Sequence, residues 1–397
     1  MDTQELLQIR KQKGSEIAKT GRIKFNNNKW LVPSQTINKY YLVTLRIDKS
    51  VCTCPDFIER GLKCKHIFAV EMTISRETSL DGCIIEAKKI TYTQDWTNYD
   101  KAQTKEKELF LRLLNELCFT IEEPEYKFGR PKMPLREMIF ASALKVYTTF
   151  SLRRFMSDIG SAKQLGYIDK IPHFSSVSLY MNKEELTPIL KELIVLSSLP
   201  LKTIENNSFS IDSSGISPSK YSRWFDHKWG KETERKIYYK VHLLTGNKTH
   251  IVCGAEITSQ FSGDAKMLPQ LVDIAHQNFN MNELTGDKAY LSHLNFEHLE
   301  KLGITPYIPF RTTSTRRRGQ TALWRKMYNY FALNQEEFYE HYHQRSNIES
   351  VFSMITRKYG NYVRSKNETA CTNEILLKVL CHNICVVIQE MFELGVE

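Results

Sequence analysis

The sequence predicts an α/β protein whose C-terminal half builds a mixed sheet flanked by helices. After about residue 200, strand-like segments alternate with helical ones, which is typical of a sheet covered by helices. The segment before it, 135–199, has apolar residues at helical spacing. The first hundred residues are rich in β-branched and aromatic residues and carry a tight group of cysteine and histidine. A helical segment and a small α+β domain are therefore expected to precede the main core.

The N-terminal part reads as strands followed by a helix and a break. KWLVPS and KYYLVTLRID are dense in strand formers, and residues 104–120 show apolar positions at helical spacing. The following EEPEYKFGRPKMPL contains three prolines and a glycine that interrupt regular structure. The expected domains are residues 1–103, residues 104–200, which are helical and could bind DNA as a helix-turn-helix, and residues 201–397.

In the C-terminal part, NSFSIDSSG predicts a strand that ends in a polar turn. A β-hairpin around Thr245-Gly246-Asn247 and the helical DAKMLPQLVDIAHQNF follow it. NELTGDKAY and TPYIPF are candidate strands, and RTTSTRRRGQTALWRKM is basic and irregular. A long helix is expected from about Gln335 to Tyr359, and a last apolar helix from about 373 to 392.

Composition places the chain among globular proteins. Hydrophobic residues make up 41% and charged residues 25%, which excludes collagen-like and wholly disordered proteins. No apolar run approaches the roughly 18 residues that span a bilayer, and the N-terminus lacks the apolar core of a secretory signal. We therefore expect a cytoplasmic protein with no membrane partner, associated with the nucleoid if the host is prokaryotic.

The net charge and the cysteines indicate a nucleic-acid partner and a metal. A formal charge of +10 fits an anionic partner, of which nucleic acid is the commonest, although charge that serves solubility alone is the alternative. Nine cysteines, an odd number in a long chain, do not resemble a secreted disulfide framework. Most of them lie in apolar stretches, where cysteine behaves as a small buried hydrophobic residue.

Cys52, Cys54, Cys64 and His66 follow the spacing Cys-x-Cys-x9-Cys-x-His. Three thiolates and an imidazole suit tetrahedral zinc, and the two sulfurs of Cys-x-Cys share one face of an extended chain. Free thiols, or a catalytic cysteine beside His66, are the alternatives. The spacing and the flanking strand-rich and apolar segments resemble the SWIM zinc finger. This resemblance implies a structural Zn²⁺ in a module that binds DNA or protein and needs the metal to fold.

Three acidic residues stand out by their surroundings. Asp212 follows an apolar strand in SIDSSG, Asp287 ends an apolar stretch in LTGDKAY, and Glu349 lies within the helical EHYHQRSNIESVFSMITRKYG. Each alone has an ordinary explanation, because aspartates at strand ends commonly cap turns and helical glutamates are usually solvated. Their sequence contexts together are what make them candidates for one site.

Over roughly residues 130–392 these motifs resemble the DDE transposases of insertion sequences, which have an RNase H-like fold. The resemblance implies that Asp212, Asp287 and Glu349 are the catalytic Asp-Asp-Glu triad. It implies two Mg²⁺ or Mn²⁺ ions, with Asp212 bridging both and each of the other carboxylates completing one site. Hard divalent cations prefer oxygen ligands and support in-line phosphodiester hydrolysis and transesterification.

The helix that carries Glu349 shows a second family signature, Tyr-x2-Arg-x3-Glu-x6-Lys. Tyr342 and Arg345 stand in its register, and at about 100° per residue Tyr342 lies within roughly 20° of Glu349 around a continuous helix. The resemblance implies that both contact DNA, with Arg345 gripping a phosphate bidentately. The chain departs from the signature at Thr356, where the family has lysine, so Arg357 and Lys358 are the neighbouring basic residues that could substitute.

A basic stretch without acidic residues precedes this helix. Its members expected to clamp DNA are Arg316, Arg317, Arg318, Arg325 and Lys326, joined by Arg311. A solvated loop is the alternative reading of such a run of charge. Trp324 could stack on a base, although an anchoring role in the core is favoured.

The resulting hypothesis is a transposase that cuts and rejoins double-stranded DNA at the ends of its own insertion sequence and at a target. It is expected to act as a homodimer or larger assembly on DNA, as the resemblance implies. The alternatives are a domesticated or catalytically weakened DNA-binding protein derived from a transposase, and an RNase H-like nuclease without strand transfer.

Overall fold

The computed structural model describes residues 3–20, 23–26, 29–36, 39–45, 50–80, 95–125, 128–129, 132–205, 207–219, 238–314 and 320–396. The chain forms two compact units. The first contains residues 1–89 and 286–343, and the second contains residues 90–285 and 344–397. Residues 286–343 thus belong to the same unit as the N-terminal strands, although they lie within the predicted domain 201–397.

The first unit begins with a four-stranded antiparallel sheet in the order β1-β2-β3-β4. Its elements are α1 (Thr3–Lys19), β1 (Lys24–Asn26), β2 (Lys29–Pro33), β3 (Tyr40–Thr44), β4 (Val51–Cys52), α2 (Pro55–Arg60) and α3 (Lys65–Leu80). Trp30, Val32 and Val43 alternate with more exposed residues along their strands and form a core with Ile67 and Val70 of α3. This arrangement is the small α+β domain that the sequence predicts.

The remainder of the first unit follows β8 in the chain. Its elements are η3 (Lys288–Tyr290), α11 (His293–Leu302), β9 (Thr305–Tyr307), α12 (Ala322–Leu333) and α13 (Gln335–Tyr342). Phe296, Phe310 and Trp324 form an aromatic core, with ring centroids 4.9 to 5.7 Å apart. Leu333, at the end of α12, packs against the core of the N-terminal sheet domain. The two parts of this unit therefore share a hydrophobic contact.

The second unit is built on the strands that carry the candidate site. Within this unit the strands of the sheet have the order β7-β6-β5-β8. The elements of the second unit are α4 (Trp96–Cys118), α5 (Leu135–Tyr147), α6 (Met156–Gln164), α7 (Phe174–Met181), α8 (Leu186–Ser198), η1 (Leu199–Leu201), β5 (Asn207–Ile216), β6 (Tyr239–Gly246), β7 (Val252–Ser259), η2 (Asp264–Lys266), α10 (Leu268–His276), β8 (Met281–Gly286), α14 (Ser346–Tyr359) and α15 (Glu368–Glu393), with η4 (His343–Arg345) at its start after the break.

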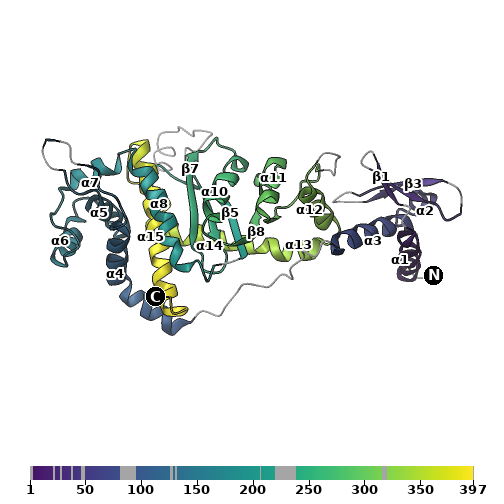
Figure 1. Ribbon diagram of the computed structural model, residues 1–397, viewed down its shortest axis with the longest axis horizontal. Helices are drawn as coiled ribbons and strands as arrows, with labels where there is room; N and C mark the ends of the chain where they lie inside the picture. Colours follow the sequence, from purple (N-terminus) through teal and green to yellow (C-terminus); the bar gives the residue numbers. More distant parts are fainter. Residues whose placement is uncertain are drawn as a thin grey trace, which may run out of the picture. The chain divides into compact units, whose positions relative to one another are not determined.

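Helices cover both faces of this sheet. Val241 and Leu243 of β6 share a buried cluster with residues of α8, α14 and α15. On the opposite face, Gly254 of β7 lets α10 approach so closely that an added Cβ would lie 3.3 Å from Leu271 Cδ2. Within this unit, α15 lies beside α8 and packs on α4 and α5 (Figure 1). The predicted mixed α/β core with a preceding helical segment is confirmed.

The direction of β8 relative to β5 follows from the contacts between them. The backbone N–H of Asn207 donates to the carbonyl of Asn280, and further along both strands Ser210 Oγ lies 2.6 Å from Thr285 Oγ1. Because the residue numbers rise together on the two strands, β5 and β8 run parallel, whereas β5, β6 and β7 are antiparallel. The sheet is therefore mixed.

Several sequence expectations differ from the structure. β5 does not end at Asp212, because Ser213, Ser214 and Gly215 continue the ladder with β6. The predicted helix from Gln335 to Tyr359 is α13, then η4, then α14, so a 3₁₀ turn interrupts it. Part of the segment expected to be irregular is helical as α12, where Thr321 caps the first turn by accepting from Trp324 N at 3.1 Å.

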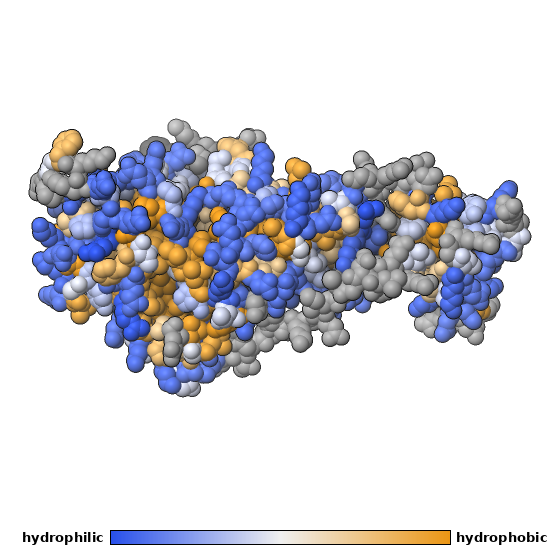
Figure 2. All heavy atoms as spheres, viewed as in Figure 1, coloured by the Kyte–Doolittle hydropathy of each residue, from blue (hydrophilic) through white to orange (hydrophobic). Residues whose placement is uncertain are grey.

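The C-terminal helix α15 also differs from expectation. It holds an 18-residue window of mean hydropathy 1.6, long and apolar enough by length and composition to cross a membrane. A search for uninterrupted apolar residues misses it because polar residues such as Asn383 are interspersed. Of that window, 78% is buried inside the protein, as expected for a core helix. Hydrophobic residues gather over the region of α15 on the face shown in Figure 2.

Candidate active site and metal centre

The four predicted zinc ligands converge in the first unit. One ligand atom from each of Cys52, Cys54, Cys64 and His66 lies within 4.8 Å of the others, and all four side chains are buried. β4 ends at Cys52, and Pro55 and Gly61 bound the short helix α2, with Gly61 in the left-handed conformation at φ 64°. The chain then returns to place the second pair of ligands at the start of α3.

The geometry of this cluster fits a tetrahedral metal. His66 Nδ1 lies 3.9 Å from Cys52 Sγ and 4.0 Å from Cys64 Sγ. Ligands bound about 2.0 to 2.3 Å from a shared zinc ion stand at separations of this kind. The hydrogen bond with Cys52 lowers the pKa of Cys64 to about 4, whereas the same contact raises the pKa of Cys52. The contacts within the cluster thus favour the thiolate form of Cys64 even without a metal. Three sulfurs and one imidazole nitrogen form a donor set that suits zinc.

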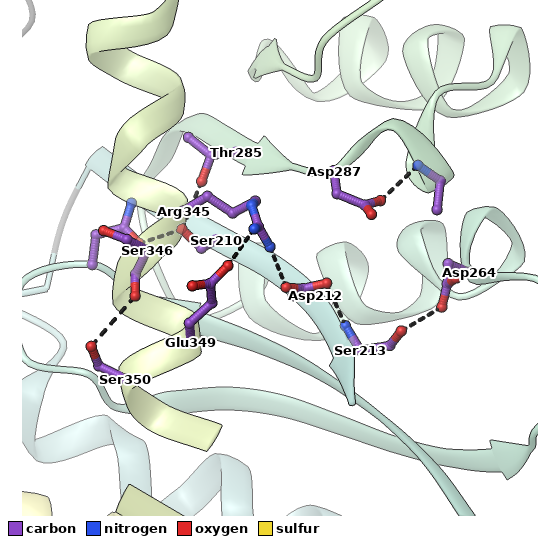
Figure 3. Close-up of polar contacts among 12 residues, drawn as sticks. Ser210, Asp212, Ser213, Asp264, Thr285, Asp287, Arg345, Ser346, Glu349 and Ser350 are labelled. Atoms are coloured by element: carbon purple, nitrogen blue, oxygen red, sulfur yellow. Dashed lines mark hydrogen bonds and ion pairs between the residues drawn. The ribbon is translucent and has the colours of Figure 1, made fainter. Parts of the chain in front are cut away.

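Two of the three predicted catalytic carboxylates meet in the second unit. The guanidinium of Arg345 donates one hydrogen bond to Asp212 Oδ2 and another to Glu349 Oε1 (Figure 3). Asp212 comes from the middle of β5, and Glu349 from the first turn of α14. Asp212 Oδ1 also accepts from the backbone N–H of Ser213 at 2.8 Å. The fold therefore brings these two carboxylates to one cation, here a guanidinium.

The exposure of these groups differs. The side chain of Asp212 is 15% exposed and that of Arg345 21%, while that of Glu349 is 58% exposed. Asp212 is thus largely shielded from water, which strengthens its electrostatic attraction to a cation. Glu349 stands at the open side, where a substrate could approach. The carboxylate oxygens that the guanidinium contacts are of the kind that hard divalent cations prefer.

Asp287 lies in the first unit, one residue after β8 ends. It caps the short helix η3, and its Oδ1 accepts from the backbone N–H of Ala289 at 2.6 Å. Its strand is the neighbour of β5. Ser210 of β5 contacts Thr285 of β8. Asp212 follows Ser210 by two residues within β5, and Asp287 follows Thr285 by two residues, beyond the end of β8.

The predicted DNA-binding residues fall in several places. Tyr342 ends α13 in the first unit, and the 3₁₀ turn η4 interrupts the continuous helix that the helical-wheel relation between Tyr342 and Glu349 assumes. Arg325 is exposed on α12 and Lys326 is half-buried beside it. Arg316, Arg317 and Arg318 lie outside the described residues.

Near the end of α14, the two basic residues differ. Arg357 is exposed, whereas Lys358 forms an ion pair with Glu106 at 2.5 Å and contacts Cys385 Sγ at 3.3 Å. Thr356, at the position where the family signature has lysine, donates its hydroxyl back to its own helix at Phe352 O, 2.8 Å away. Lys358 thus ties α14 to α4.

Trp324 is buried and packs 3.7 Å from the ring of His293, which agrees with the anchoring role that the sequence favours. Arg311 donates to the carbonyl of Lys288 at 3.3 Å. This contact connects the start of the basic stretch to η3, the turn that Asp287 caps. Basic side chains and a carboxylate therefore lie on connected segments of the first unit.

Sequence reasoning did not find the polar groups around Asp212. Ser213 Oγ donates to Asp264 at 2.7 Å, and Lys240 Nζ donates to the same carboxylate at 2.8 Å. Burial acts to raise the pKa of Asp264, but the hydrogen bonds from Lys240 and Ser213 outweigh it and lower that pKa. Alternation along β5 could not indicate these groups, because Ser213 stands on the opposite face of the strand from Asp212, together with Phe209 and Ile211.

Comparison with known families agrees with this geometry. Residues 206–384 match the model of the transposase DDE domain, and residues 41–74 match that of the SWIM zinc finger. The first match spans β5 to most of α15, and the second contains all four Cys/His ligands. The chain therefore combines a transposase DDE domain with an N-terminal SWIM zinc finger, and the predicted architecture is confirmed.

Proposed function

We propose that this protein cleaves DNA strands at the ends of an insertion sequence and joins them to a target in a reaction that requires divalent metal. The observation that carries the proposal is the shared contact of Asp212 and Glu349 with one cationic group, from elements far apart in the chain. Carboxylates brought together in this way repel one another unless a cation lies between them. A transposase DDE domain supplies the family context.

Asp287 completes the proposed triad. Its support is the parallel register of β5 and β8, in which Ser210 stands beside Thr285 and each aspartate follows two residues later. Asp212 lies on β5, and Asp287 directly follows β8, the strand beside it. The match to the transposase DDE domain supports Asp287 as the third member of the triad.

The donor set fits Mg²⁺ or Mn²⁺, because three carboxylates from separate elements provide hard oxygen ligands with positions left for water and phosphate. Such ions, when bound, activate the attacking hydroxyl and stabilise the leaving oxygen. The chain's own residues then bind and orient the DNA. We assign phosphate binding to Arg345 once it leaves the carboxylates, and to the exposed Arg325 and Arg357.

In the N-terminal module we assign a structural Zn²⁺ to the buried Cys52, Cys54, Cys64 and His66. The support is the SWIM match together with a donor set that suits zinc. The module would contribute to DNA binding, and a homodimer or larger assembly would bring paired DNA ends together. Both of these statements rest on the family.

The test is a strand-transfer assay on oligonucleotides that carry the sequences flanking the gene, with Mg²⁺ or Mn²⁺. Wild-type protein should cut and join, and Asp212→Ala and Glu349→Ala should abolish both. Glu116→Ala is the matched control, because Glu116 is a 62%-exposed helical glutamate paired with an arginine four residues earlier, as Glu349 is. Cleavage that survives Glu349→Ala would overturn the assignment, and cleavage without joining would point to a nuclease.

One observation favours a second candidate, a transposase-derived DNA-binding protein with weakened chemistry. Thr356 replaces the lysine of the family signature and bonds its own helix, and the nearby Lys358 is held by Glu106. These basic contacts would be missing from the site. Tight DNA binding by wild-type protein with no metal-dependent cleavage would support this candidate over the first.

A further inference from the structure

Beneath the proposed catalytic carboxylates lies a chain of buried polar side chains that the reaction does not use. Ser208 and Ser210 of β5 share the strand face of Asp212, because they precede it by four and two residues. Both serines are buried, as are Asn247 and Thr285. Burying a polar group costs free energy unless the group is hydrogen-bonded, so the hydrogen-bond partners of these four residues indicate their structural role.

The hydrogen bonds of these residues form one continuous path. Ser210 Oγ donates to Asn247 Oδ1 at 2.5 Å, which leaves the hydroxyl of Thr285 to donate to Ser210 across 2.6 Å. Asn247 Nδ2 donates to Ser208 Oγ at 2.7 Å, and Ser208 Oγ donates to Gln344 Oε1 at 2.6 Å. Thr285 Oγ1 also contacts Phe209 O at 3.3 Å, and Asn247 Nδ2 also contacts Gln344 Oε1 at 3.4 Å. Along the path itself the donors point from β8 through β5 to η4. A chain with a single direction polarises each bond in turn and strengthens it.

The ends of this path lie next to the proposed triad. Thr285 precedes Asp287 by two residues, and Ser210 precedes Asp212 by two. Gln344 directly precedes Arg345, whose side chain contacts Asp212 and Glu349. The path therefore joins the three segments that carry the carboxylates.

Asn247 occupies the centre of the path. It lies in the β6–β7 turn, and its backbone N–H donates to Ser208 O at 3.2 Å. The turn itself is fixed by Glu205, which accepts from the backbone N–H groups of Lys248 and Thr249 at 3.0 and 2.7 Å. The turn that carries Asn247 is thus held by Glu205, which is not part of the path. The amide of Asn247 can accept a hydrogen bond from Ser210 and donate one to Ser208.

We propose that Asn247 is a positioning residue that sets the turn at Gln344 and Arg345 against β5 and β8, and so fixes the spacing of the carboxylates. The catalytic consequence of this inference rests on the proposed function. The coupling between the β6–β7 turn and η4 stands on the hydrogen bonds alone.

Two substitutions break the path at different links. Asn247→Leu replaces the amide by an apolar group of similar size and removes both routes to Gln344. Ser208→Ala removes the 2.6 Å bond to Gln344 and leaves only the longer contact of Asn247 at 3.4 Å. Thr245→Val is the matched control: Thr245 pairs with Ser210 across the ladder, is fully buried, and among the described residues its hydroxyl has no partner. It removes a buried hydroxyl from the same hairpin and leaves the path intact.

The first measurement is hydrogen–deuterium exchange on the full-length protein. Asn247→Leu and Ser208→Ala should speed exchange of peptides covering 344–350 by about fivefold or more, whereas Thr245→Val should leave them unchanged. The second is Mn²⁺ titration, in binding and in DNA cleavage. The two variants should need about tenfold to a hundredfold more Mn²⁺, since groups that orient metal ligands typically have effects of this size.

The outcomes separate the two proposals. Faster exchange confined to 205–212 and 244–252, with 344–350 as in the wild type, would overturn the positioning role. If exchange at 344–350 responds but wild-type protein neither binds Mn²⁺ nor cuts DNA, the proposed function fails and the coupling remains. If both variants needed the same Mn²⁺ concentration as the wild type, the path would not position the carboxylates, and this part of the proposal would be overturned.

Discussion

Asp212 accepts a hydrogen bond from Arg345, a residue 133 positions further along the chain. The sequence motif leads one to expect this arginine on a DNA phosphate, yet its guanidinium contacts two carboxylates. A guanidinium provides charge and paired donors that suit either anion. The proposed function gives this side chain two roles, holding the carboxylates together and later binding DNA, and these two roles exclude each other at any one moment.

Arg345→Ala should separate these roles. Because the guanidinium and a divalent ion compete for the oxygens of Asp212 and Glu349, its removal should tighten Mn²⁺ binding by about twofold to tenfold, the range expected for partly exposed ion pairs. DNA cleavage should fall, since a phosphate contact is lost. Calorimetric Mn²⁺ titration without DNA measures the first effect. Weaker Mn²⁺ binding in this variant would mean that Arg345 supports the metal site.

Loss of zinc should affect more than the finger. Zinc contributes on the order of 10 kcal/mol to folding of small finger domains, so Cys52→Ser should unfold the N-terminal module and lower zinc content from about one per chain. Because Leu333 packs on the core of that module, exchange should also rise along α12. Elemental analysis and exchange mass spectrometry measure both effects, with Cys118→Ala as control. A zinc-free protein with a protected module would refute the site.

Acid should destabilise the second unit through His382. Burial lowers the pKa of His382 to about 4, and its Nε2 lies 3.0 Å from the carbonyl of His250. The unfolded chain takes up a proton near pH 6.5 and the folded chain only near 4, so stability should fall as pH drops between these values, by about 1 to 3 kcal/mol.

His382→Gln should flatten this slope, because glutamine does not titrate. Urea unfolding of both proteins at pH 7 and pH 5 gives the difference. Equal losses of stability on acidification in the wild type and the variant would show that other groups account for the pH dependence.

Thr356→Lys should strengthen DNA binding. The hydroxyl of Thr356 bonds only its own helix among the described contacts, so a lysine that restores the family signature adds one cationic group. The slope of log affinity against log salt should steepen by about one contact. Met354→Lys adds the same charge at a 42%-exposed position of the same helix and is the control. Identical slopes for both variants would show a general charge effect.

The sequence predicted the parts of the fold that depend on local pattern. Spacing alone located the zinc ligands, because four donors within fifteen positions must come together once the short α2 turns the chain. The strand predicted at NSFSIDSSG is β5, and the apolar spacing of α10 and α15 also predicted their elements. The resemblance to a known family, rather than periodicity, selected Asp212, Asp287 and Glu349 from the many acidic residues.

What escaped the sequence depends on contacts between distant segments. The helical spacing of the flanking segments does not indicate that a 3₁₀ turn separates Tyr342 from Glu349, although residues 343–347 are all polar. The pairing of Lys358 with Glu106 and of Ser208 with Gln344 joins residues far apart in the chain, so no spacing rule finds them. The triad as a catalytic unit stays a prediction, as do the DNA contacts and the three-domain division.

The edge strand β7 depends on a helix made much later in synthesis. Asn383 of α15 pairs with both backbone groups of Val252, 131 residues earlier in the chain. At typical ribosome speeds this gap corresponds to roughly ten seconds or more during which β7 lacks that partner. A nascent chain should thus expose an incomplete sheet to chaperones and proteases, and it acquires a finished DDE domain only as translation of α15 is completed.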